Sequence, residues 1–505
     1  MPAQARLNRS VLAALLAAAA ACGGESTKPP AVGPASVLAK SSADPQTAVV
    51  GTAVATAPSV TVKDANGKPV AGVTVTFSVT AGGGTVTGAS QPSSSTGVAT
   101  LGSWTLGTTA GANTVTASAT GVPSVTFTAT GTAGPVTTVN VSAASLVVLE
   151  GQTQQVTATA VDQYGNVNST APLTFSTAVS AIATVSNAGL VSGVAPGATT
   201  IAATSGAFSK TVAITVLGHP SGTSRVDAPE PGRPFAVRAS SSDVLLVGEQ
   251  DSNRLGRYDL PSSTSTITVA VGLDPTDVNF SPDGSRAYVT NQASGTLGVI
   301  DVATNTQTST VNIGGSPYRV TTSRDGSKIY VTTGQGTLFT VDAATRAIVD
   351  SLVLGSALNG LAVHPSQPII YVTTTGGALY EVSATTGLLL RTKGMGGQPQ
   401  EVVVSPDGAK LYIAKESGAL EIRATSDLAI TDTIPAASGT FGAAVTPDGA
   451  QLYATQPGTG VVVIDLATKT VLRTIAGGVP RRVTFDRFGG TAFIGNEGGY
   501  VSFIK

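Results

Sequence analysis

A unit of about 41 residues occurs seven times in the C-terminal part of the chain and constrains the fold more than any other feature. The stretch "SPDGSRAYVTNQ" at 281–292 returns as "SRDGSKIYVTT" at 323–333, "SPDGAKLYIAK" at 405–415 and "TPDGAQLYATQ" at 446–456. The equivalent strand positions are 42, 42, 41, 41, 41 and 40 residues apart and are Leu246, Tyr288, Tyr330, Tyr371, Tyr412, Tyr453 and Phe493. Seven copies with about four short strands each predict a seven-bladed β-propeller.

The ends of the repeats predict how this propeller closes. The last copy stops at "YVSFIK", after its third strand, so its outer strand is missing. The segment "TSRVDAPEPGRPFAV" at 223–237 aligns with "TSTVNIGGSPYRV" at 308–320, and we expect residues 223–228 to supply that outer strand. Such a pairing removes an open sheet edge. The repeat resembles the YVTN family of seven-bladed propellers, whose name is spelled by residues 288–291.

Two different β-rich units precede the repeats. In residues 35–133 the Asn66-Gly67 pair lies between the alternating runs "SVTVKD" and "VTVTFSV", a pattern that predicts a hairpin. The pieces "VKDANGKPVAGVTVTFSV" and "TGVATLGSWTLGTTAGANTVTA" resemble the group 1 bacterial Ig-like domain of invasin-type proteins. In residues 134–217 the run "IATVSNAGLVSGVAPGATTI" resembles the group 2 bacterial Ig-like domain. The predicted fold class is all-β, with two Ig-like β-sandwiches followed by the propeller at 218–505.

The N-terminal residues predict export and a lipid anchor. A basic start and the apolar run "VLAALLAAAAA" precede Cys22, and the run is shorter than the roughly 20 apolar residues that span a bilayer. "AAAC" at 19–22 resembles the lipobox of bacterial lipoproteins, although Leu is commoner at its first position. In that family the Cys carries lipid, and Gly23 after it favours the outer membrane over the inner one. An ordinary cleaved signal with an incidental Cys is the alternative. The expected segments are a signal peptide at 1–21 and a lipidated Cys with a flexible tether at 22–34.

Composition argues against several kinds of site. A formal net charge of -1 provides no basic field to attract nucleic acid. The sequence has two His, one Cys and two Met, so zinc, haem or copper sites lack ligands, and we expect no metal and no cofactor. Asp64 and Asp162 at the sandwich ends are better explained as turn residues than as ligands of Ca²⁺.

The recurring Asp residues of the repeats are predicted to form turns. Each precedes a Gly or ends a strand, and a short Asp side chain accepts hydrogen bonds from backbone N–H groups in such turns. Their positions on separate blades keep them apart, so they are not expected to form a catalytic or metal site. These residues are Asp283, Asp325, Asp407 and Asp448, and, after the third strands, Asp301, Asp342 and Asp465.

The segments that vary between copies form the candidate ligand site. They connect an outer strand to the next inner strand and are expected to surround one mouth of the central channel. The candidate residues are Asp277, Tyr318, Arg319, Asn359, Glu401, Phe441, Arg481 and Arg482, with Asn291, Lys415, Glu416, Asn496 and Glu497 from adjacent loops. A mixed rim with aromatic side chains suits a peptide or a sugar, and an ordinary solvated end is the alternative.

The expected function is non-catalytic binding or adhesion by an outer-membrane lipoprotein that faces the periplasm or the cell surface. Its Ig-like domains would act as a stalk for a ligand-binding propeller. The expected partners are the membrane, through the lipid anchor, and an envelope glycan, a peptide or another surface protein, with no nucleic acid. One alternative is a propeller enzyme for a small exported metabolite such as a lactone, with His364 as a residue to test. Another is a purely structural spacer of the envelope.

Overall fold

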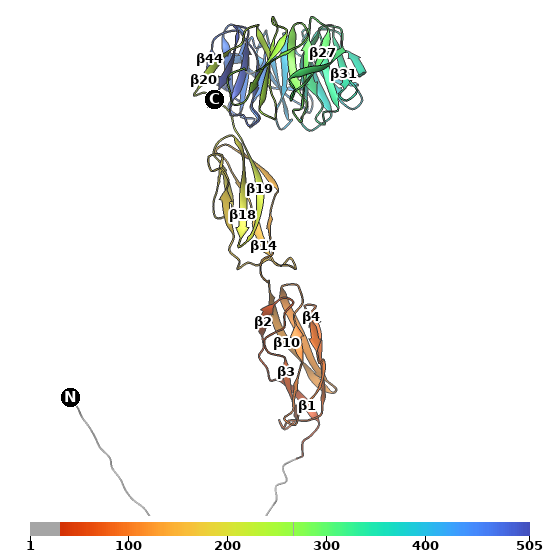
Figure 1. The fold of residues 1–505 in the computed structure, drawn as a ribbon. Helices are drawn as coiled ribbons and strands as arrows, with labels where there is room; N and C mark the ends of the chain where they lie inside the picture. Colours follow the sequence, from red (N-terminus) through yellow and green to blue (C-terminus); the bar gives the residue numbers. More distant parts are fainter. Residues whose placement is uncertain (1–30, 266) are drawn as a thin grey trace, which may run out of the picture. The chain divides into compact units, whose positions relative to one another are not determined.

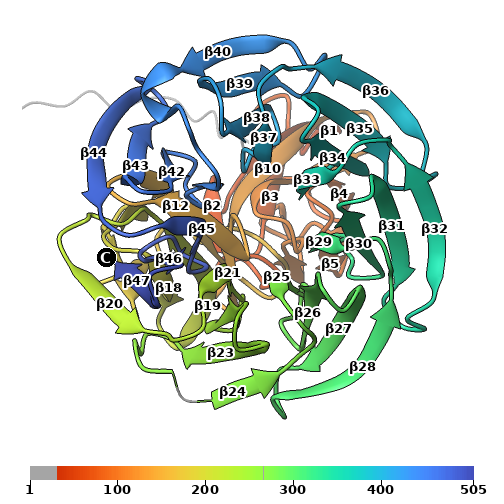
Figure 2. The same cartoon turned by 90° about the horizontal axis from the view of Figure 1, so that it is seen from above.

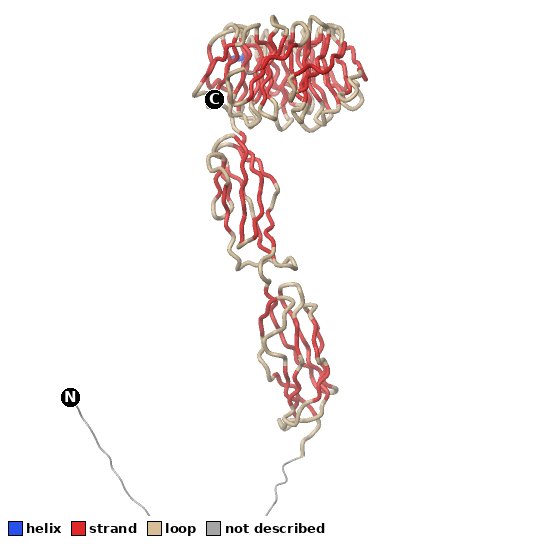
Figure 3. The backbone as a smooth tube through the Cα atoms, viewed as in Figure 1, coloured by secondary structure: helices blue, strands red, loops and turns tan. Residues whose placement is uncertain are grey.

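The computed structural model describes residues 31–265 and 267–505, which form β-strands joined by turns and loops (Figures 1 and 3). In this part of the chain the one helical segment is a 3₁₀ turn, η1 (Pro435–Ala437), and no helix is long and apolar enough to cross a bilayer. The predicted signal peptide, Cys22 and most of the tether lie outside the described residues. The chain divides into two compact units, residues up to 138 with 160–171, and 139–159 with 172–505.

Two sheets enclose the core of the first unit. Alternate residues of β4 are buried, as a strand with one face on a core requires. Val60 and Val62 from one sheet pack with Phe77 and Phe127 from the other and with Trp104 in a single cluster. The sheet orders are β1 (Ala35–Lys40), β3 (Ser59–Asp64), β7 (Val98–Thr100); β2 (Gln46–Val49), β10 (Val122–Thr132), β9 (Gly111–Ala119), β4 (Thr74–Ala81), β6 (Ser90–Pro92); and β5 (Thr85–Thr87) with β8 (Ser103–Thr105).

The hairpin predicted around Asn66 and Gly67 forms only next to its turn, where Lys63 and Pro69 make an antiparallel bridge, and the two flanking strands do not pair with each other. The N–H of Gly67 donates to the carbonyl oxygen of Asp64 at 3.0 Å, and Gly67 has φ 79°. The flanking strands nevertheless join different sheets, with β3 beside β1 and β7 and β4 beside β9 and β6. The chain therefore crosses over the core after the turn, because each strand buries its apolar face from a different side.

The next strands form two more sheets around a core of aliphatic side chains. Val148, Ile201 and Ile214 from one sheet pack with Ala183 and Val191 from the other. The sheet orders are β12 (Ser145–Leu149), β19 (Phe208–Leu217), β18 (Gly197–Ser205), β15 (Thr174–Thr177); and β13 (Thr153–Gln155), β17 (Leu190–Gly193), β16 (Ala183–Val185). A further pair consists of β11 (Thr138–Val141) and β14 (Ala158–Val161).

Seven four-stranded antiparallel sheets lie between residues 225 and 504 and surround a common centre (Figure 2), and we refer to them as the ring. In six of them the four strands are consecutive, from the inner strand to the outer one. These are β21 (Pro234–Ala239), β22 (Val244–Glu249), β23 (Arg254–Asp259), β24 (Ile267–Ala270); β25 (Pro275–Phe280), β26 (Arg286–Asn291), β27 (Thr296–Asp301), β28 (Thr306–Asn312); β29 (Pro317–Thr322), β30 (Lys328–Thr333), β31 (Thr337–Asp342), β32 (Ile348–Val353); β33 (Leu358–Val363), β34 (Ile369–Thr374), β35 (Ala378–Ser383), β36 (Leu389–Gly394); β37 (Pro399–Val404), β38 (Lys410–Lys415), β39 (Leu420–Ala424), β40 (Ile430–Ile434); and β41 (Ala443–Val445), β42 (Gln451–Gln456), β43 (Gly460–Asp465), β44 (Thr470–Ala476).

The remaining sheet joins the two ends of the ring. Its inner strands are β45 (Pro480–Phe485), β46 (Ala492–Asn496) and β47 (Tyr500–Ile504), and its outer strand is β20 (Arg225–Pro229). β20 runs antiparallel to β47, with Arg225 opposite Ile504 (Figure 2). The predicted pairing of this early segment with the C-terminal strand is confirmed, although the strand begins and ends slightly later than the expected 223–228.

The residues equivalent to Tyr288 join neighbouring sheets, as predicted. Tyr288 of β26 packs in one cluster with Val320 and Ile329 of the next sheet. Tyr453 contacts Phe485 of the next sheet edge-on, with 5.1 Å between ring centroids. All seven members of the row are buried. The core of the ring therefore consists of the apolar seams between adjacent sheets.

Candidate functional site

A layer of charged side chains crosses the centre of the ring. Six of the seven inner strands have a register shift near their start, such as the one between Pro317 and Arg319 that leaves Tyr318 without a partner in the ladder. A bulge of this kind redirects side chains next to the ladder. At the third position of this segment the seven repeats carry Ala236, Asp277, Arg319, Gly360, Glu401, Gly442 and Arg482. Two of these positions are Gly because the next inner strand approaches closely: a Cβ at Gly360 would lie 2.8 Å from Val402 N, and one at Gly442 would lie 2.3 Å from the carbonyl oxygen of Arg481. The other four residues of this layer besides Ala236 are charged.

The four charged residues of this layer pair with one another across the channel. The Arg319 guanidinium lies 3.2 Å from Asp277 Oδ1 and also contacts Glu401. Arg482 Nη1 donates to Glu401 Oε2 at 2.5 Å. The other oxygen of Asp277 accepts from the backbone N–H of Val320 at 3.0 Å. All four side chains are less than a tenth exposed, so the pairs are screened little by solvent.

The two arginines of the layer are in unequal surroundings. Burial lowers the pKa of the Arg319 guanidinium, but the charges of Asp277 and Glu401 outweigh it and raise that pKa overall. For Arg482, burial and the neighbouring charge of Arg319 dominate, and its pKa is lowered. Arg482 is therefore the less compensated of the two positive charges.

Aromatic rings cover one side of the charged layer. Phe235 and Phe441 meet edge-on, with centroids 5.6 Å apart. The Arg482 guanidinium carbon lies 4.8 Å from the Phe441 centroid and 5.8 Å from that of Tyr318. Arg481 stacks on Phe441 at 4.6 Å and donates to Glu497 Oε2 at 3.0 Å. Cation–π contacts of this kind are favourable when the groups are shielded from water.

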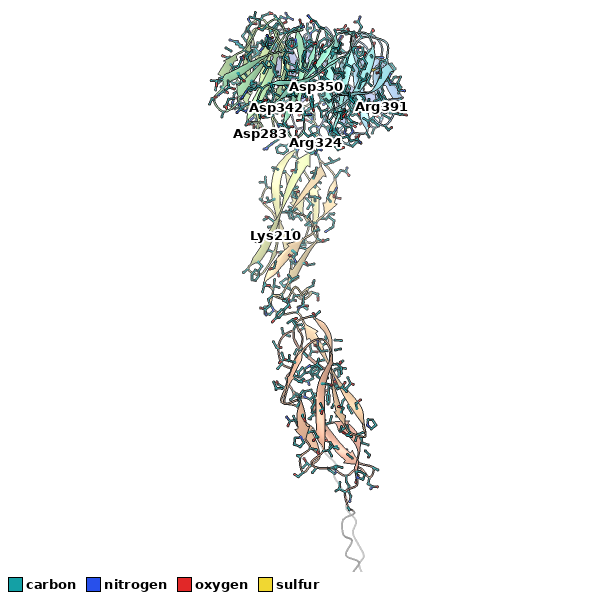
Figure 4. All side chains as sticks on the ribbon, turned by 90° about the vertical axis from the view of Figure 1, so that its right-hand side faces the viewer. Lys210, Asp283, Arg324, Asp342, Asp350 and Arg391 are labelled. Carbon is teal, nitrogen blue, oxygen red and sulfur yellow. The ribbon has the colours of Figure 1, made fainter. Side chains whose placement is uncertain are left out.

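A cavity of about 400 Å³ lies on the other side of the layer. The four charged residues contribute to its wall, and it extends along the inner strands to Pro365, Pro406, Pro447 and Asp486 in the turns that follow them. Asp283 and Arg324, from two turns of the same kind, lie at this face of the ring (Figure 4). The hollow part of the channel therefore reaches the face opposite the predicted rim.

The structure brings most of the predicted ligand-binding residues together, but it buries them. Asp277, Tyr318, Arg319, Glu401, Phe441, Arg481 and Arg482 form the charged layer and its aromatic cover. Asn359 is bonded elsewhere, because its amide donates to the carbonyl oxygen of Pro399 at 3.2 Å and to Gln400 Oε1 at 3.1 Å. Only Tyr318 and Arg481 of the eight are more than a tenth exposed, so the expected solvated rim is replaced by a packed interior. Of the loop residues, Asn291, Lys415 and Asn496 are buried, Glu497 is half-buried and Glu416 is exposed.

Two residues of this site were missed in the sequence. Phe235 occupies the position of Tyr318 in its repeat and completes the aromatic cover. Arg238 lies three residues further along β21 and lines the cavity. The repeat alignment carried the signal for both, because residues at one repeat position lie at one depth in the channel.

The turn residues have the local bonds that the sequence predicts. Asp283 accepts from the N–H of Ser285 at 3.1 Å, and Asp465 accepts from the N–H of Thr468 at 2.7 Å. Hydrogen bonds from Ser323 and Ser327 lower the pKa of Asp325 to about 2. The carboxylates of Asp64 and Asp162 each accept three or more hydrogen bonds, including those from Gly33 and Gly134 N–H. Among the described residues, no three His, Cys, Asp or Glu side chains gather as a metal site would require.

His364 is confirmed as a turn residue. Its Nδ1 accepts from the N–H groups of Ser366 and Gln367 at 3.1 and 3.0 Å. Its Nε2 lies 3.0 Å from the carbonyl oxygen of Gly408 in the next sheet. Both ring nitrogens are therefore engaged in holding the turn.

A buried pair of carboxyl groups near the closing sheet was also missed. Glu230 follows β20, and the hydroxyl of Tyr258 donates to it. Glu249, at the end of β22, accepts from Arg254 Nε at 2.8 Å. Burial and the hydrogen bond with Glu230 raise the pKa of Glu249 to about 7. Glu249 occupies the same repeat position as Asn291, which was among the predicted loop residues. A comparison of the repeats could therefore have identified Glu249.

Comparison with known proteins supports part of this description. Residues 135–216 match the family model of the bacterial Ig-like domain (group 2), which confirms the resemblance inferred for residues 134–217. Hydrazine synthase of Kuenenia stuttgartiensis is a similar solved structure, with 18% identity, a TM-score of 0.48 and coverage of 57% of this chain and 99% of that chain. No curated protein matches the chain. The chain is all-β and contains a bacterial Ig-like domain.

Proposed function

We propose that this chain is an exported, lipid-anchored protein of the cell envelope that binds a ligand without catalysis. In this proposal a seven-bladed β-propeller is the binding domain, and two Ig-like domains connect it to the anchor. The repeat of about 41 residues, the seven four-stranded sheets and the pairing of β20 with β47 support the propeller. The "AAAC" sequence at 19–22 supports the anchor, and the resemblance of residues 35–133 supports a group 1 Ig-like domain.

The observation that carries the proposal is the central cavity with charged residues in its wall. Ligand sites are typically concave, with volumes of about 300–1,000 Å³ and a few polar groups that orient the ligand. The cavity of about 400 Å³ meets this description, and Asp277, Arg319, Glu401 and Arg482 provide its polar groups. We assign the binding of an envelope glycan, a peptide or a smaller exported compound to this cavity.

The alternative of a lactone-processing enzyme has less support. His364 was its candidate residue, and both of its ring nitrogens already hold backbone groups of turns. A general base needs a free nitrogen within hydrogen-bond reach of the substrate. An enzyme of this kind would therefore have to use other residues.

The test fills the cavity and measures binding of the full-length protein to isolated cell envelopes. Ala444 lines the cavity, so Ala444→Phe would occupy part of it. Ala409→Phe is the matched control, because Ala409 is exposed in a turn and does not line the cavity. The proposal predicts that Ala444→Phe abolishes binding and that the control retains it. Equal binding by both variants would place the site elsewhere, and no binding by the wild type would favour a spacer.

A further inference from the structure

We propose that the central cavity takes a ligand with a carboxylate group and that Arg238 is the residue that pairs with it. This inference rests on the proposed function and names the chemical class of its ligand. Three observations carry it: the place of Arg238 in the channel, the hydrogen-bonding state of the layer beneath it, and the balance of charge in the cavity wall.

Among the seven equivalent positions of the described inner strands, Arg238 is the one charged residue. The equivalent positions of the other six inner strands are Asn279, Thr321, Ala362, Val403, Ala444 and Thr484. Arg238 Nε makes a long contact of 3.4 Å with the carbonyl oxygen of Val278. Within the described chain, no carboxylate forms an ion pair with Arg238, although it lines the cavity and is half-buried. A guanidinium offers five donors, so most of its hydrogen-bonding capacity is left for a ligand.

The carboxylates of the charged layer below Arg238 are already engaged. Glu401 contacts the guanidiniums of both Arg319 and Arg482. Asp277 is held by Arg319 and by the Val320 N–H. Neither acid therefore provides a partner for Arg238.

The unpaired positive charge of the wall points to an anion. The formal charges of the lining residues balance, with Arg238, Arg319 and Arg482 against Asp277, Glu401 and Asp486. Asp277 and Glu401 pair with Arg319 and Arg482, and Asp486 Oδ1 accepts from the N–H groups of Phe488, Gly489 and Gly490. Arg238 is therefore the arginine of the wall that has no carboxylate partner in the described chain. Arginine matches a carboxylate in shape as well as in charge, because two parallel N–H groups meet its two oxygens.

Two sources of this chemistry fit the cavity, a free organic acid and the C-terminal carboxylate of a peptide. Isothermal titration calorimetry of the full-length protein in detergent separates them with two pairs of probes. Succinate is compared with its neutral diamide, and the dipeptide Ala-Ala is compared with its C-terminal amide. Binding of an acid without binding of its matched amide identifies the source.

Arg238→Gln tests the assigned residue, and Arg324→Gln is the matched control. Arg324 is exposed at the same face of the ring and does not line the cavity, so its loss changes the net charge equally (Figure 4). We expect Arg238→Gln to weaken binding of the acid by at least about tenfold and Arg324→Gln to leave it unchanged. Thermal unfolding of each variant shows whether the protein still folds.

The inference is overturned if neither acid binds at millimolar concentration, if acid and amide bind alike, or if Arg238→Gln binds as the wild type does. These results are separate from the test of the proposed function. Envelope binding that is lost in Ala444→Phe but unaffected by Arg238→Gln would keep the cavity as the site and exclude a carboxylate as the recognised group.

Discussion

Glu249 is a single side chain that makes the stability of the ring depend on pH. Its carboxyl group is fully buried and next to Glu230 at the junction between the closing segment and the first sheet. Burial and this neighbour favour the protonated form and raise the pKa of Glu249 to about 7, from an ordinary value of 4.5. The folded protein therefore holds a proton that the unfolded chain releases at lower pH.

This difference predicts the direction of a stability change. The contribution of Glu249 to the free energy of unfolding is largest below pH 4.5. It decreases as the pH rises to about 7, because in this range the unfolded chain binds fewer protons than the folded one. Glu249→Gln cannot lose a proton, so its stability relative to the wild type should be higher at pH 8 than at pH 5. Urea unfolding followed by the near-ultraviolet circular dichroism of tyrosine measures this difference. A difference between the two proteins that is independent of pH would contradict the shifted pKa.

At the scale of elements, β20 is the strand on which closure of the ring depends. Ala228 in this strand is 3% exposed and packs with Phe493, Val501 and Phe503. Ala228→Asp would place an unpaired charge in this cluster, and we expect it to reduce the free energy of unfolding of the ring by about 2–4 kcal/mol. Denaturant unfolding of the full-length chain measures the loss.

Val226→Thr provides the control for this strand. Val226 is 49% exposed and pairs with Phe503, so the substitution keeps a β-branched residue in the same ladder without entering the core. Its effect should stay within about 0.5 kcal/mol. Equal stability of the Ala228→Asp protein and the wild type would mean that β20 does not hold the ring closed.

The elements that the sequence predicted well are those set by repetition. Tyr288 and its equivalents lie on the second strand of each sheet because one local pattern recurs and each copy folds alike. The hairpin at Asn66 and Gly67 remains short, and β3 and β4 pair with other strands, for the opposite reason. A turn depends on a few adjacent residues, whereas the partner of β3 is chosen by burial against distant strands, which a short pattern does not contain.

The sequence identified most residues of the candidate site but did not predict that they are buried. The alignment identified the variable positions, including Arg319, Glu401 and Arg482, but it placed them on an exposed rim. Their burial accompanies ion pairs across the channel, in which Glu401 meets both guanidiniums. These pairs join sheets that are far apart in the sequence, so they became visible only in three dimensions.

At the scale of the whole molecule, the proposed anchor predicts where the protein is found in a cell. Cys22 precedes all the described residues, so its replacement leaves the folded sheets unchanged. We expect the wild-type protein in the membrane fraction and Cys22→Ser in the soluble fraction of an expressing bacterium. Fractionation followed by immunoblotting measures the distribution. Retention of Cys22→Ser in the membrane at the wild-type level would exclude the lipid anchor.

The pairing of β20 with β47 also has a consequence for the order of events during synthesis and export. Arg225 and Ile504 are 279 residues apart, so an early strand must wait for the last one before its sheet forms. Until then the arc of sheets has free edges that can pair with other chains or be cleaved by proteases. Pairing of β20 with β47 therefore distinguishes complete from incomplete copies, because a copy that lacks its final strand keeps free sheet edges and remains vulnerable to degradation.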